Sequence, residues 1–66
     1  MNTKPRNVND ALRRITALLT SVGLDIEEYL ENPTSYTPEY FKDVATAVLD
    51  AHLLVTWTRD QLKAKS

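Results

Sequence analysis

The chain has 66 residues, with eight Lys or Arg, nine Asp or Glu and a net charge of −1. It therefore holds one domain at most, and no overall charge draws it to nucleic acid or to an anionic membrane. The absence of Cys and the single His exclude disulfides, thiolate zinc sites and a His-based structural metal site. No run approaches the ~20 apolar residues of a membrane span, so we expect a cytoplasmic protein.

The first predicted element is a helix of medium length. Residues 1–6 are polar and include Pro5, and we expect a flexible arm there, followed by a single helical domain over residues 7–66. Asn7 or Asn9 can cap the helix, and its apolar residues recur within an arc of roughly 120°. Gly23, the only glycine, is expected to end the helix in a left-handed conformation.

Two further helices are predicted after Gly23. Asp25 can act as the N-cap of a short helix, with Glu28 completing a capping box, and the Asn32-Pro33 pair ends that helix. A long third helix starts with Pro38 at its first position and continues to about Lys63, because neither Gly nor Pro follows. The predicted fold is all-α: a small three-helix domain with a medium helix, a short helix and a long C-terminal helix.

The long helix carries two apolar stripes. The core-facing stripe consists of Phe41, Val44, Val48, Ala51, Val55 and Leu62. The second stripe consists of Ala45, Leu49, Leu53 and Trp57. Two shorter helices can cover one side of a long helix and not both, so we expect the second stripe to mediate self-association, most simply as a helical homodimer. The alternatives are a long helix that folds back within one chain, or a stripe reserved for a different protein.

No arrangement of catalytic residues is visible. His52 has no carboxylate on its helical face and no nucleophile nearby, and we expect a partly buried packing residue. A single glycine excludes the Gly-rich phosphate loops. The carboxylate pairs among residues 27–31 are expected to be solvated. We therefore predict no enzyme activity, no cofactor and no metal site.

Two charged surfaces remain as candidate partner sites. An acidic patch consists of Asp25, Glu27, Glu28 and Glu31. It can dock a basic protein surface, which favours a non-catalytic protein-interaction module: an adaptor, a regulator or an inhibitor of a larger protein. The same four carboxylates argue against a helix-turn-helix, because they would face phosphates in a major groove. The alternative function is a small dimeric nucleic-acid-binding regulator that uses basic residues near the termini, namely Arg6, Arg13, Arg14, Arg59 and Lys63. A purely solubilising role for the acidic patch also stays open.

Overall fold

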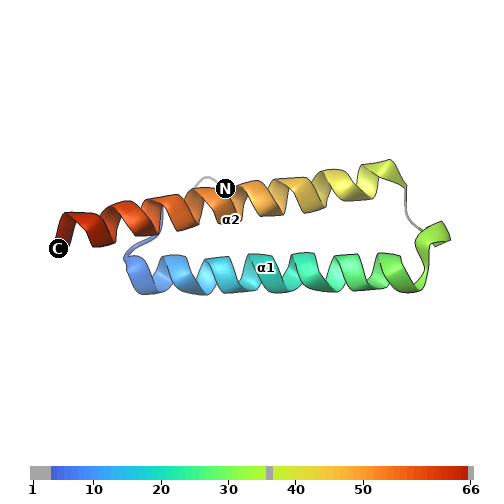
Figure 1. The fold of residues 1–66 in the computed structure, drawn as a ribbon, viewed down its shortest axis with the longest axis horizontal. Coiled ribbons are helices and arrows are strands. Elements are labelled where there is room, and N and C mark those ends of the chain that lie inside the picture. Colours follow the sequence, from blue (N-terminus) through green and yellow to red (C-terminus); the bar gives the residue numbers. More distant parts are fainter. Residues whose placement is uncertain (1–3, 36, 66) are drawn as a thin grey trace.

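The computed structural model describes residues 4–35 and 37–65. It is an antiparallel hairpin of two long helices, α1 (Val8–Glu31) and α2 (Pro38–Lys65), joined through the short 3₁₀ turn η1 (Pro33–Ser35). The two helices lie side by side, and α2 extends beyond the start of α1 (Figure 1). The described residues contain no strand, which confirms the all-helical prediction. Of the predicted arm, residues 1–3 lie outside the described residues, and residues 4–6 precede the cap of α1.

The start of α1 is a well-formed cap. Asn7 has an extended backbone, and its side-chain Oδ1 accepts a hydrogen bond of 2.8 Å from the backbone N–H of Asp10. Asp10 in turn accepts from the backbone N–H of Arg6 at 3.1 Å and pairs with Arg14 at 3.1 Å. The first bond satisfies an amide that the first helical turn would otherwise leave without a partner, and the bond from Arg6 ties the residue before the cap to that turn. Of the two candidate caps, the structure therefore uses Asn7.

The helix does not end at Gly23, and the prediction of three helices is wrong. Gly23 lies inside α1 and does not have a positive φ, so Asp25 and Glu28 are mid-helix residues and form no capping box. A mid-helix glycine costs only about 1 kcal/mol relative to alanine. Val22 and Tyr29, on either side of it, are seven residues apart and both turned toward α2, with Val22 buried and Tyr29 half-buried. Breaking the helix would disrupt that packing.

Asn32 ends α1, as the Asn-Pro pair predicts. Its backbone N–H donates to the carbonyl of Glu28 at 3.0 Å. The other helix, α2, begins at Pro38 as predicted and continues without a break to Lys65, two residues beyond the expected end.

The seam between the helices is filled by small and medium-sized residues. The buried apolar residues are Ala11, Val22, Val44, Ala51 and Leu54. Thr58 is also buried, and its hydroxyl donates to the carbonyl of Leu54 at 2.8 Å. At the loop end, the rings of Tyr29 and Phe41 meet edge to face with centroids 5.1 Å apart. Within the described residues no large side chain is completely buried.

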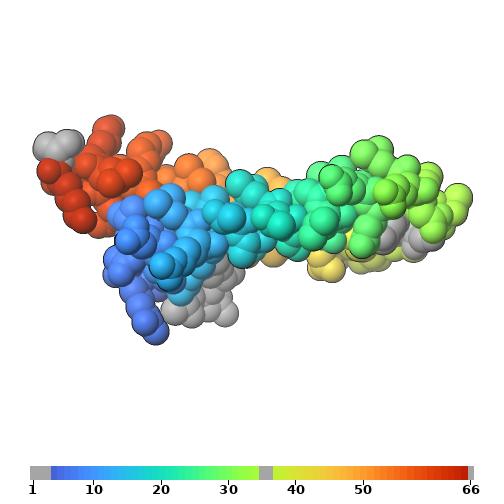
Figure 2. Space-filling model, turned by 90° about the horizontal axis from the view of Figure 1, so that it is seen from below, coloured from blue at the N-terminus to red at the C-terminus, as the bar shows by residue number. Residues whose placement is uncertain are grey.

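The hairpin is elongated and has a large surface. Its Cα atoms span 48 × 18 × 16 Å, and the rod-like form is evident in the space-filling view (Figure 2). The radius of gyration is 14.3 Å, whereas a compact domain of this length has about 11 Å. The accessible surface is 5230 Å², against about 4,200 Å² for a typical folded chain of this mass. Each chain therefore leaves about 1,000 Å² more surface accessible than a compact monomer would. Within the described residues, neither helix combines the length and the apolar character needed to cross a bilayer.

Replacing Gly23 with Ala tests the continuity of α1. A Cβ at this position meets no atom within 4 Å, so we expect Gly23→Ala to stabilise the protein by about 1 kcal/mol through helix propensity. Urea unfolding followed by circular dichroism at 222 nm measures the change, with Ser21→Ala as a control in the same turn. A helix that ended at Gly23 in a left-handed conformation would instead be destabilised by this substitution.

Candidate protein interface

One side of the hairpin carries a row of large apolar side chains from each helix. We define the apolar face by these seven residues: Leu12, Leu19 and Ile26 from α1, with Phe41, Val48, Val55 and Leu62 from α2. Within each row the residues are seven apart, and each side chain is between 37 and 53% exposed. A seven-residue spacing keeps a row on one side of a helix, with a drift of about 20° per repeat.

The two rows lie on the same side of the hairpin. At 3.6 residues per turn, each row lies about 40–100° around its helix axis from the buried seam. The rotation from seam to row has the same sense in both helices, namely the sense in which the chain winds. Because the helices are antiparallel, equal displacements in that sense turn both rows toward one common face. Near the start of α1 and the end of α2, Leu12 from one row and Val55 and Leu62 from the other line the same groove, as expected for rows on one face.

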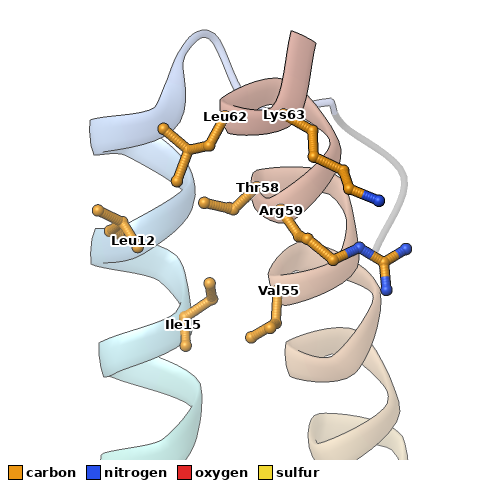
Figure 3. A pocket seen from close by; sticks show the side chains of 7 residues that line it. All are labelled: Leu12, Ile15, Val55, Thr58, Arg59, Leu62 and Lys63. Atoms are coloured by element: carbon orange, nitrogen blue, oxygen red, sulfur yellow. The ribbon is translucent and has the colours of Figure 1, made fainter. Parts of the chain in front are cut away.

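A groove of about 610 Å³ follows the seam at the end where the chain begins and finishes. It is lined by Leu12, Ile15, Val55, Thr58, Arg59, Leu62 and Lys63. Figure 3 shows the apolar side chains around the space between the helices, while the charged ends of Arg59 and Lys63 point away from α1. The Arg59 guanidinium also bonds to Asp60 at 3.1 Å. The groove is thus an apolar hollow with two cations along one edge.

The opposite side of the hairpin is polar. By the same helical geometry it carries Asp10 and Arg14, which pair with each other, together with Glu28 and Asp43. The same side also carries the half-buried Trp57, so it is more polar than the apolar face but contains apolar residues as well.

The structure separates the residues that the sequence grouped as a core-facing stripe. Val44 and Ala51 are buried in the seam, whereas Phe41, Val48, Val55 and Leu62 belong to the apolar face. The residues predicted for self-association lie on the side of α2 turned away from α1. There, Leu49 and Leu53 are each 56% exposed, Ala45 is exposed and Trp57 is half-buried.

The residues of the predicted acidic patch are distributed around the last two turns of α1. Its four residues all lie near the end of α1, but Glu27 and Glu31 face outward while Glu28 turns toward the polar side. Asp25 is half-buried and the other three are exposed. His52 is exposed, not partly buried as expected.

The hairpin places the predicted basic residues at one end, on different sides of the two helices. Arg6, Arg13 and Arg14 lie at the start of α1, and Arg59 and Lys63 lie near the end of α2, so all five are at one end. We define the open half as residues 4–19 with 52–65, and the loop half as residues 20–51. The open half has seven basic and two acidic side chains, a net charge of +5. The loop half has one basic and seven acidic side chains, a net charge of −6. The overall charge of −1 conceals this polarity.

Among the described residues, no group of three His, Asp or Glu side chains is arranged to hold a metal ion, and every buried polar side-chain atom has a hydrogen-bond partner. Comparisons with protein-family models, characterised proteins and solved structures find no match for the chain. The apolar face and the charge polarity are therefore the features of this chain that point to a function.

Adjacent leucines on α2 test the assignment of buried and exposed faces. Leu54 is 4% exposed, so we expect Leu54→Ala to cost about 2–5 kcal/mol of unfolding free energy. Leu53 is 56% exposed, so Leu53→Ala should change it by less than about 0.5 kcal/mol. Urea unfolding of both variants at one protein concentration measures the difference. Equal costs would mean that the Leu53 side of α2 is buried in an assembly.

Proposed function

We propose that this chain is a non-catalytic protein-interaction module that binds helical protein surfaces through its apolar face. The observation that carries the proposal is the row of half-exposed large side chains along each helix, on a common side of the hairpin. The largest apolar patch on the surface of a protein is often a site of association.

The spacing of the apolar face supports a helical partner. Rows such as Leu12–Leu19–Ile26 and Phe41–Val48–Val55–Leu62 repeat every seven residues. This is the repeat with which helices pack side by side in coiled coils and four-helix bundles. A partner that offers one or two helices with the same repeat can insert its side chains between these rows.

The charge polarity adds selectivity to this proposal. A partner approaching the apolar face meets a basic open half and an acidic loop half. Complementary charges raise association rates and disfavour the wrong orientation of a partner. An adaptor, a regulator or an inhibitor of a larger protein would use both properties.

A second candidate function is nucleic-acid binding by the open half. The observation in its favour is that the hairpin gathers the basic residues of both termini at one end within a single chain. The net charge of +5 on the open half attracts phosphates to that end. The loop half repels the same phosphates, so contact would be confined to the end of the hairpin.

Photo-crosslinking tests the primary proposal. We would place p-benzoylphenylalanine at Val48 on the apolar face, at Leu53 in the second stripe, or at Gln61, which belongs to neither. In cells that produce the protein, we expect Val48 to form a protein adduct that mass spectrometry identifies, with little product from Gln61. Equal yields at Val48 and Gln61, or no protein adduct at Val48, would contradict the proposal. An adduct from Leu53 alone would move the interface to the second stripe.

Charge reversal separates the two candidate functions. Under the nucleic-acid alternative, Arg13→Glu with Arg14→Glu should reduce retention of a DNA or RNA duplex and flatten its salt dependence, as measured by fluorescence anisotropy. Under the primary proposal, Glu27→Lys with Glu28→Lys should slow the association of the protein captured at Val48, and duplex binding should be negligible throughout. Duplex binding lost only in the arginine variant would favour the alternative.

A further inference from the structure

We infer that the apolar face is covered by a second copy of this chain, packed antiparallel so that the open half of each copy lies over the loop half of the other. The result is a four-helix bundle with a two-fold axis perpendicular to the helices. The inference rests on the proposed function and names its partner.

Surface area is the first argument for a second copy. The chain exposes about 1,000 Å² more than a compact monomer of its mass would. A standard stable interface buries about 800 Å² on each partner. The excess on one hairpin is therefore sufficient for an interface with one other surface of similar size. An identical hairpin supplies the same area, the same elongated outline and the same seven-residue repeat.

Charge complementarity selects the orientation. Two hairpins can pair their apolar faces about a two-fold axis along the bundle or about one across it. An axis along the bundle places the open half, with a charge of +5, over another open half, and the loop half, with −6, over another loop half. An axis across the bundle places each +5 half over a −6 half. Only the second arrangement is attractive over its whole length.

The two-fold axis across the bundle also determines which helices of the two copies contact each other. It places α1 over α1 of the second copy and α2 over α2, each pair antiparallel. The axis passes near the helix midpoints, Leu19–Thr20 in α1 and Ala51–His52 in α2. Arg59 and Lys63, along the edge of the groove, then lie over the acidic half of the second copy, and the groove receives apolar side chains from that half.

Sedimentation equilibrium tests whether a second copy of the chain covers the apolar face. We expect a dimer whose affinity falls several-fold when the salt concentration rises, because opposite charges attract across the interface. Leu19→Asp with Val48→Asp should abolish the dimer, and Leu53→Asp, on the far side of α2, should leave it intact. A monomeric wild-type chain would overturn the inference, as would a dimer that only Leu53→Asp dissociates or one that salt strengthens.

A distance measurement tests the orientation in a chain that keeps its apolar face. The sequence has no Cys, so Thr34→Cys in η1 carries a single spin label at the loop end. In the antiparallel bundle the two labels are about 40 Å apart, at 1.5 Å of rise per residue. In the parallel bundle both loops are at one end, and the labels are separated by about 10–20 Å, one or two interhelical distances. Pulsed dipolar spectroscopy resolves these values, and the shorter one would overturn the inference.

The outcomes also separate this inference from the proposed function. A monomeric chain whose Val48 probe captures a different protein leaves the proposed function standing and removes the second copy as the partner. A monomeric chain with no protein adduct at Val48 removes both.

Discussion

Two helices packed along one seam cannot enclose a core, and this constraint governs the rest of the structure. Each helix can turn only one side toward its neighbour. The seam is filled by short side chains, with Ala11 and Ala51 buried at the contact, so the helices approach closely and the larger residues are displaced to the flanks. The large apolar residues of this chain therefore lie beside the seam, half-exposed, because no third element is available to cover them.

Because the uncovered apolar residues repeat every seven positions, they form a continuous row along each helix. Val44, Ala51 and Thr58 occupy the seam at seven-residue intervals, and a parallel row beginning at Phe41 follows the same interval three positions earlier. A helix that carries two such rows faces two neighbours, as in a four-helix bundle. The hairpin supplies one neighbour to each helix, and the second row of each helix is available for another molecule.

The sequence predicts local features better than the relation between helices. Asn7, Pro38 and the Asn32-Pro33 pair act through their own backbone neighbourhood, and the structure has helix ends at or beside each of them. The prediction of a helix end at Gly23 is wrong because a glycine is also tolerated inside a helix, at a cost of about 1 kcal/mol. The seven-residue row from Val8 through Val22 to Tyr29 continues across it, and that long-range regularity could have indicated one helix.

The apolar face could not be assigned from the sequence for a similar reason. Both stripes of α2 are plausible contact surfaces until the position of α1 is known. The three-helix prediction expected two shorter helices to cover the whole core-facing stripe. Once α1 is a single helix, it covers the side of α2 that holds Val44, Ala51, Leu54 and Thr58. Phe41 and Val55, expected in the core, then become surface residues by geometry, without any change in their own helical position.

Charge and apolar contact have separate tasks in this hairpin. At physiological ionic strength, exposed charges are screened over about 8 Å, close to the 8–10 Å between packed helices. Opposite halves can therefore bias an encounter toward the antiparallel orientation, and their contribution to affinity is limited to a several-fold, salt-dependent part. Affinity must come from the apolar rows. These rows align equally well when one hairpin is shifted along the other by seven residues, or about 10 Å, so they do not fix the register alone. A slip by one repeat would keep the rows aligned, but it would uncover apolar side chains at both ends and move like charges toward each other. The charge polarity and the finite length of the rows together leave the centred antiparallel pairing as the arrangement that satisfies both.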